Sequence, residues 1–202
     1  MACPRCGIDQ KKSPMIETER LLLRPFRMDD LGLIKALYCD AEVLRYTPFD
    51  TMSHEQAEAH LNRIVEDWKQ DPLQSLEFVM EGKEDKEKIG RCHILIDFET
   101  DTGMIGWFLR KELWGQRYAL ESGQALIRYS FDILGLHRVN ALCNPGNLAS
   151  RRILERCGLR QEAWFRQKCR YIKGGITTWE DEVEYAVLSS EWAVTSRASA
   201  SG

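Results

Sequence analysis

Trp114-Gly115-Gln116-Arg117-Tyr118-Ala119-Leu120-Glu121, with Gly106-Trp107-Phe108-Leu109 just before it, is the most informative stretch of the sequence. Alternating residues predict a strand over residues 104–110, and a helical apolar period predicts a long helix from Gly115 to Leu134, ended by Gly135. A helix N-terminus after a glycine-containing loop presents unpaired backbone N–H groups, and the helix dipole favours an anion there. The stretch therefore predicts a turn that can bind a phosphate group.

The elements around this turn predict a mixed sheet. The long helix leads into a short apolar strand at residues 137–143, and a helical crossover joins strands that lie parallel. Hairpins over residues 76–98 and 160–188 add antiparallel strands. Three further helices are predicted, opened by Asp29 or Asp30, by the capping box Ser53-His54-Glu55-Gln56, and by Asn147. The order is that of an α/β protein (α+β mixed sheet) with helices on both faces.

Four motifs in one order resemble the GNAT superfamily of N-acetyltransferases, in the form found in its RimJ/RimL branch. Residues 144–150 followed by Cys157-Gly158-Leu159 are similar to the family's Asn-x-x-Ser helix that ends in Gly-Phe. Residues 19–25 resemble its opening strand, and residues 185–192 resemble its last strand. The most informative stretch resembles Gly-Tyr-Trp-Leu and Trp-Gly-x-Gly-Tyr-Ala-x-Glu, with matches at Gly106, Trp114, Gly115, Tyr118, Ala119 and Glu121. The likeness covers residues 16–192, which we expect to form one domain.

The resemblance implies the GNAT acyl-CoA N-acyltransferase fold, with about seven strands. Two parallel strands, residues 104–110 and 137–143 here, would splay apart and admit the pantetheine arm of coenzyme A. The implied reaction transfers acetyl from acetyl-CoA to a primary amine by direct attack. That amine is a protein N-terminal α-amine or a small molecule such as an aminoglycoside or polyamine. The implied coenzyme A site comprises Phe108, Leu109, Trp114, Gly115, Gln116, Arg117, Tyr118, Ala119, Asn144, Asn147 and Ser150.

The sequence leaves open which residues act as the catalytic acid and base. Ser150 aligns with the serine that in RimL-like enzymes is suspected of protonating the departing thiolate, although a serine in a first helical turn also caps a helix. Some group must accept the proton of the amine, directly or through water. The RimL-like glutamate aligns with Cys169, whose neighbour Lys168 is expected on the opposite face of the strand. Asp97, Glu99 and Asp101, in the turn before residues 104–110, are the alternative bases. Because Cys169 replaces the glutamate, we predict that no single residue is a strong base and that water linked to backbone carbonyls and a turn carboxylate carries the proton away.

Two departures motivate rival functions. Arg117 replaces the motif's second glycine; at a positive φ it would cost about 1 kcal/mol, and otherwise it could contact the pyrophosphate. The missing glycine at Arg117 and the missing glutamate at Cys169 together motivate the first rival hypothesis, a GNAT-fold module that binds coenzyme A and catalyses no reaction. The second rival is an interaction protein that uses Cys3 and Cys6 as half of a zinc knuckle, the alternative being a flexible extension.

Composition bounds the partners and the compartment. A net charge of -3 does not favour a nucleic-acid binder, and no apolar run approaches the length of a membrane span. Without an export signal, we expect a cytoplasmic protein, with a leader at residues 1–15 and a disordered tail at residues 193–202. No spacing of His, Cys and Asp predicts a metal enzyme. The oligomeric state is left open between a monomer and a homodimer.

Overall fold

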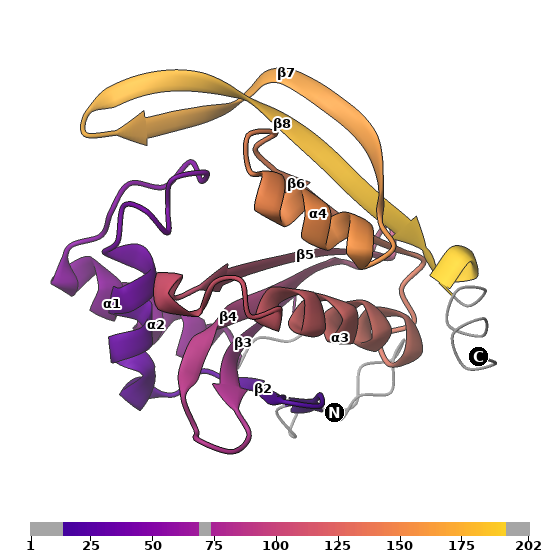
Figure 1. Cartoon of the computed structure of the whole chain (residues 1–202), viewed down its shortest axis with the longest axis horizontal. Coiled ribbons are helices and arrows are strands. Elements are labelled where there is room, and N and C mark those ends of the chain that lie inside the picture. The colour runs from indigo at the N-terminus through magenta and orange to yellow at the C-terminus, as the bar shows by residue number, and fades with distance from the viewer. Residues whose placement is uncertain (1–13, 69–73, 193–202) are drawn as a thin grey trace.

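The computed structural model describes residues 14–68 and 74–192, and these form one mixed sheet flanked by helices (Figure 1). The sheet has eight strands in the order β1-β2-β3-β4-β5-β6-β8-β7. Their bounds are β1 Ile16–Glu17, β2 Leu21–Pro25, β3 Ser75–Gly82, β4 Lys88–Asp97, β5 Thr102–Leu109, β6 Arg138–Cys143, β7 Arg160–Lys173 and β8 Ile176–Leu188. The expected mixed sheet is confirmed. The eighth strand is the two-residue β1, which pairs with β2.

In the described residues, four α-helices and two short 3-10 turns flank the sheet, and residues 189–192 are also helical. The helices are α1 Leu31–Tyr38, α2 His54–Asp67, α3 Tyr118–Asp132 and α4 Leu148–Arg156, and the turns are η1 Met28–Asp30 and η2 Lys111–Leu113. The capping box before α2 is confirmed, since Ser53 Oγ accepts from Gln56 N and Gln56 Oε1 accepts from Ser53 N. Cys3, Cys6, most of the leader and the tail lie outside the described residues.

The helices cover both faces of the sheet because β3 alternates between two apolar clusters. Phe78 and Met80 pack in the cluster that contains residues of α3 and α4. Val79 points the other way, into a cluster formed with α1 and α2. The period of two along the strand thus fixes which helices lie on which face.

Strands β5 and β6 separate soon after they meet. They pair in parallel only between Thr102–Met104 and Arg138–Asn140, whereas β5 pairs with β4 as far as Leu109. Beyond Asn140, β6 pairs only with β8 among the described strands. The edge of β5 from Ile105 to Leu109 that faces β6 therefore has no strand partner in the described residues.

The start of the long helix differs from the prediction by three residues. Helix α3 begins at Tyr118 because Gly115 (φ 80°) and Arg117 (φ 67°) are left-handed, which no α-helix accommodates. The arginine at the motif's second glycine thus does occupy a left-handed position. An L-residue there costs about 1 kcal/mol relative to glycine.

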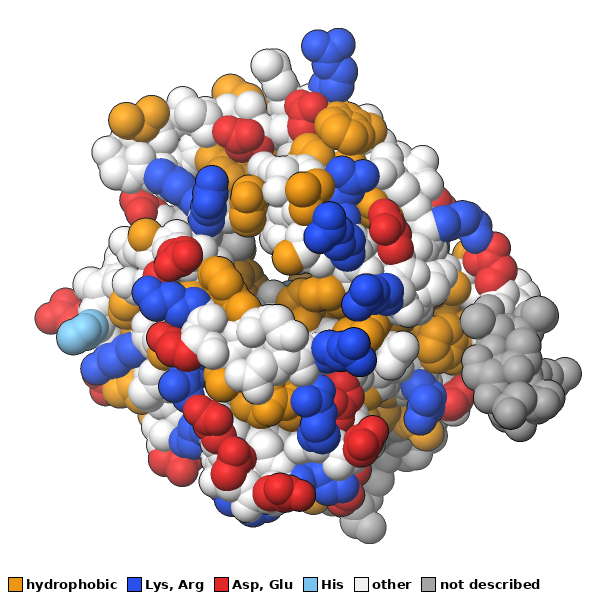
Figure 2. Space-filling view, in the orientation of Figure 1, with side chains coloured by type: hydrophobic (Ala, Val, Ile, Leu, Met, Phe, Trp, Pro, Cys, Tyr) orange, Lys and Arg blue, Asp and Glu red, His pale blue; other side chains and the backbone are white. Residues whose placement is uncertain are grey.

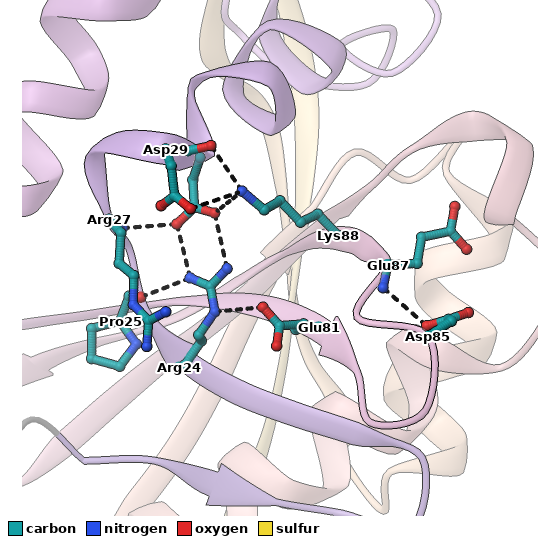
Figure 3. Close-up of polar contacts among 9 residues, drawn as sticks. Arg24, Pro25, Arg27, Asp29, Glu81, Asp85, Glu87 and Lys88 are labelled. Atoms are coloured by element: carbon teal, nitrogen blue, oxygen red, sulfur yellow. Dashed lines mark hydrogen bonds and ion pairs between the residues drawn. The ribbon is translucent and has the colours of Figure 1, made fainter.

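A buried ionic network joins β2, η1, β3 and β4 (Figure 3). Arg24 donates to both Asp30 carboxylate oxygens, at 2.8 and 2.9 Å, and its Nε donates to Glu81 at 2.7 Å. Lys88 Nζ lies 2.7 Å from Asp30 Oδ1. The sequence suggested that the Asp30 side chain caps α1, but it does not. It accepts hydrogen bonds from Arg24 and from Arg27 N instead.

Candidate active site

A cavity of about 940 Å³ lies between the separated strands, the β7–β8 hairpin and the α1–α2 connection. Figure 2 shows the hollow on this face, with Lys and Arg side chains gathered over α3 and α4 beside it. Ten of the eleven residues predicted to bind coenzyme A lie in its wall. The exception is Gln116, whose backbone oxygen accepts from Arg20 at 3.1 Å.

The turn before α3 forms one end of the cavity and suits a phosphate group. Its left-handed residues, Gly115 and Arg117, place backbone N–H groups at the start of a helix of 15 residues. Arg152 and Arg156, on α4, also line the cavity and add positive charge with Arg117. Sequence reasoning missed these two arginines, although their i, i+4 spacing after the Asn-x-x-Ser motif places them on one helix face.

Contacts from the connection between β1 and β2 hold this turn. Glu121 accepts from Arg20 N at 2.8 Å, from Arg20 Nε at 2.7 Å and from Thr18 Oγ1. The Arg20 guanidinium also lies over the Tyr118 ring, 4.5 Å from its centroid. Burial alone would raise the pKa of Glu121, but these hydrogen bonds outweigh it and lower that pKa. The turn is therefore tied at Gln116, Tyr118 and Glu121.

The unpaired edge of β5 forms the floor of the cavity. A Cβ atom at Gly106 would lie 2.5 Å from His93 Cε1, so a larger residue there would displace the His93 ring. Beyond Gly106, Phe108 and Leu109 face the cavity, and the Trp114 indole donates to Leu109 O at 3.0 Å. An extended ligand that carries amides could thus pair along β5 as a strand does.

Ser150 lies in the cavity wall at the start of α4. The cap of this helix comes from Asn147, whose side chain accepts from Ser150 N at 3.1 Å. The hydroxyl of Ser150 is therefore not needed to cap the helix. Asn144, also in the wall, donates to Tyr171 OH at 3.4 Å.

A buried polar cluster forms the wall on the α1–α2 side. Arg91 donates to Tyr38 OH, lies 2.9 Å from Glu77 Oε2, and donates to His93 Nδ1 at 3.0 Å. Burial, with the Arg91 charge, lowers the pKa of His93 to about 3. Burial, with the Arg91 and Arg63 charges, lowers that of His60 to about 4. Both histidines are therefore neutral near pH 7 and poor proton acceptors.

The β7–β8 hairpin supplies the opposite wall, through Cys169, Tyr171 and Glu182. Glu182 Oε1 accepts from Cys169 Sγ at 3.0 Å, and Glu182 Oε2 lies 2.8 Å from Lys168 Nζ. Burial and Glu182 raise the pKa of the Cys169 thiol to about 11, so it is neutral near pH 7. Lys168 and Cys169 do not point apart as expected, because β7 is irregular here.

The turn carboxylates predicted as bases lie elsewhere. Asp97, Glu99 and Asp101 are not among the residues that line the cavity. Asp97 instead accepts from Glu99 N at 2.9 Å and from Thr100 Oγ1 at 2.7 Å, within its own turn. These bonds lower the pKa of Asp97, the Thr100 hydroxyl contributing most. The structure therefore does not bring Asp97 and Glu99 together with Ser150.

The described residues form neither a metal cluster nor a membrane-spanning helix. Among the described residues, no three His, Cys, Asp or Glu side chains lie close enough together to hold a metal ion. In the same part of the chain, every helix is too short or too polar to span a bilayer.

Comparison with known proteins adds to this geometry. Residues 20–160 match the family described as "Acetyltransferase (GNAT) domain". The chain is 32% identical over 177 residues to the uncharacterised N-acetyltransferase YnaD of Bacillus subtilis. This alignment covers 88% of this chain and 98% of that protein. It is likewise 32% identical to the uncharacterised N-acetyltransferase p20 of Bacillus licheniformis, over 87% of this chain and 97% of that one.

Solved structures are similar over the same length. A GNAT-family acetyltransferase from Bacillus anthracis superposes with a TM-score of 0.76 at 28% identity, over 88% of this chain and 99% of that one. A spermidine N-acetyltransferase from Vibrio cholerae, in complex with CoA and spermine, gives a TM-score of 0.74 at 21% identity, over 86% and 98%. At that identity the second likeness shows the fold alone.

Proposed function

Because this chain belongs to the GNAT acetyltransferase family and is an acetyl-CoA-dependent N-acetyltransferase, we propose that its cavity holds acetyl-CoA at the α3–α4 end and a primary amine at the other. The amine nitrogen attacks the thioester carbonyl directly, and Ser150 supplies a proton to the departing sulfur. The observation that carries the proposal is the separation of β5 and β6 beside the turn at Gly115–Arg117.

The donor end fits coenzyme A by its chemistry. The unpaired edge of β5 offers backbone groups to the amides of pantetheine, and the helix start offers N–H groups to the pyrophosphate. Arg117, Arg152 and Arg156 add charge-assisted donors for phosphate oxygens. The residues present therefore suit the acetyl donor, which supplies the activated acetyl group.

The acceptor end favours an amine that carries one positive charge. Its wall contains Arg45, Arg63 and Arg91 and also Glu42, Glu77 and Glu182, so the formal charges balance. A polycation would need an acidic excess to offset its own charge. We therefore propose a protein N-terminal α-amine, as in the RimJ/RimL branch, or a small monoamine, in preference to a polyamine.

The test is release of the coenzyme A thiol from acetyl-CoA with a panel of amines. The panel contains short peptides with free N-termini, small monoamines, an aminoglycoside and spermidine. We expect turnover with a peptide or monoamine and a lower kcat/KM for spermidine. Thiol release no faster than without an acceptor, for every amine, would contradict the proposed function. A preference for spermidine would contradict only the acceptor class.

A further inference from the structure

An irregular segment of β7 brings two consecutive side chains to one carboxylate. The register of β7 against β8 shifts between Phe165 and Cys169, and Gln167 has a left-handed φ of 48°. Asp181 anchors this bulge by accepting from Gln167 N at 2.8 Å and from Trp164 Nε1 at 2.7 Å. In a regular strand, residues 168 and 169 would point to opposite faces. The bulge turns both toward Glu182, as bulges beside functional sites often do.

Glu182 is placed to meet a ligand. Its side chain is 14% exposed and lines the cavity that also contains Ser150 and Tyr171. Lys168 and the Cys169 thiol contact one carboxylate oxygen each, which fixes the carboxylate in one orientation. A carboxylate oxygen accepts more than one hydrogen bond, so both oxygens retain capacity for a ligand.

The other side chains around the cavity that could accept a proton are held by other contacts or are neutral near pH 7. His60 and His93 have strongly lowered pKa values, and the Cys169 thiol has a raised one. Glu77 is held by the buried Arg91 at 2.9 Å. Glu42 lies at the exposed rim, with its side chain 61% accessible and 3.7 Å from Lys111. Glu77 and Glu182 are both 14% exposed, but Glu77 is paired with the buried Arg91, whereas Lys168 beside Glu182 is 44% exposed.

From this geometry we propose that Glu182 is a catalytic residue that binds the acceptor ammonium and takes one proton from it. The inference rests on the proposed function. The ammonium nitrogen passes one proton to a Glu182 carboxylate oxygen, directly or through one water, and so exposes its lone pair. The nitrogen then forms a C–N bond to the acetyl carbon, and the C–S bond breaks. The second proton of the nitrogen goes to the sulfur through Ser150, and the proton on Glu182 leaves to solvent.

Lys168 and Cys169 act as positioning residues in this scheme. Neither is proposed to touch the substrate, because both direct their polar atoms at Glu182. Cys169→Ser keeps a hydrogen-bond donor at the same place and should keep kcat within about threefold of the parent. Cys169→Ala removes the donor and should lower kcat several-fold at unchanged coenzyme A affinity.

The activity test compares Glu182→Gln with Glu180→Gln, using whichever panel amine the parent protein acetylates best. Glu180 is a matched control because it lies two residues away on β8 and accepts from Thr178 instead. Loss of a general base costs about 100-fold or more, so we expect that fall in kcat/KM for Glu182→Gln and none for Glu180→Gln. Glu182→Gln should also shift the pH profile upward, because the enzyme then depends on amine that is already neutral. Activity of Glu182→Gln within threefold of the parent at every pH would overturn the inference.

A second readout needs no turnover. The thiol pKa of Cys169 is measured by iodoacetamide alkylation against pH, with the Cys169 peptide quantified by mass spectrometry. Because Glu182 raises this pKa, Glu182→Gln should lower it, while Glu180→Gln should not. An unchanged thiol pKa in Glu182→Gln would show that the two groups are not in contact and would overturn the arrangement. Failure of the parent protein to acetylate any amine would count against the proposed function. The thiol pKa tests the contact between Cys169 and Glu182 independently of activity.

Discussion

At the level of single residues, the chemical role of the Ser150 hydroxyl can be tested without disturbing helix α4. Because Asn147 caps α4, replacement of the Ser150 hydroxyl should leave the helix intact. If the hydroxyl protonates the departing thiolate, Ser150→Ala should lower kcat by at least about tenfold with little change in coenzyme A affinity. Steady-state kinetics and calorimetry with coenzyme A check these two expectations.

Asn147→Ala is the matched control for Ser150→Ala. Loss of a helix cap costs about 1 kcal/mol of stability, so Asn147→Ala should lower the urea midpoint while Ser150→Ala leaves it nearly unchanged. A Ser150→Ala protein with parental kcat would assign the residue no part in the chemistry. An equal loss of stability in both variants would instead make Ser150 a structural residue.

At the scale of the element, sequence patterns predicted regular structure well and irregular structure poorly. Period and turn residues placed both hairpins and helices α1 to α4, because these signals act within a few residues of one another. The bulge at Gln167 depends on Asp181, which lies on the next strand, so alternation along β7 alone put Lys168 and Cys169 on opposite faces. Glu182 was missed for the same reason. Its partners Lys168 and Cys169 lie on the neighbouring strand β7, so no pattern along β8 indicates them.

The tip of the β7–β8 hairpin is joined to the α1–α2 connection over the cavity. Lys173 Nζ donates to Leu44 O at 2.8 Å and to Arg45 O at 2.9 Å, and Tyr171 OH donates to Tyr46 O at 2.9 Å. Asp50 accepts from Gly174 N at 2.9 Å. These contacts join two elements that both line the acceptor end, so they hold that end in shape.

Lys173→Met should therefore weaken amine binding selectively. The change keeps the aliphatic stem and removes the donors to both carbonyls. We expect KM for the amine to rise about threefold to tenfold, in the range of the net contribution of one ordinary hydrogen bond, with the coenzyme A affinity unchanged. Amide hydrogen exchange over residues 39–53 should become faster. Lys86→Met, a change of an exposed lysine in the β3–β4 turn, should alter neither quantity. Equal losses of amine and coenzyme A binding would contradict the assignment of this contact to the acceptor end.

At the scale of the whole molecule, the ionic network around Arg24 links the first third of the chain to the centre of the sheet. Arg24 and Asp30 are 2% and 0% exposed, so neither can exchange its partner for water. Removing one member of a buried pair leaves an uncompensated charge and costs about 3–5 kcal/mol. By contrast, the exposed pair Lys83–Glu17, at 3.3 Å, should contribute less than about 1 kcal/mol. Stability should therefore depend on one buried network far more than on surface ion pairs.

This network also predicts how stability varies with pH. Burial alone would raise the pKa of Asp30, but hydrogen bonds from Arg24, Lys88 and the Arg27 backbone outweigh it and lower that pKa. Between the lowered value and the value of about 4 in the unfolded chain, the unfolded state binds more protons, so stability falls as pH falls. The contribution of Asp30 is complete above about pH 4 and is lost as pH drops through its folded pKa.

Urea unfolding from pH 7 to pH 3 should show this loss in the parent protein. Asp30→Asn should be less stable at pH 7 by about 3–5 kcal/mol and should depend less on pH, whereas Glu17→Gln should follow the parent. An Asp30→Asn protein with the parental acid dependence would assign that dependence to other carboxylates, such as Glu121 and Glu184, whose pKa values are also lowered.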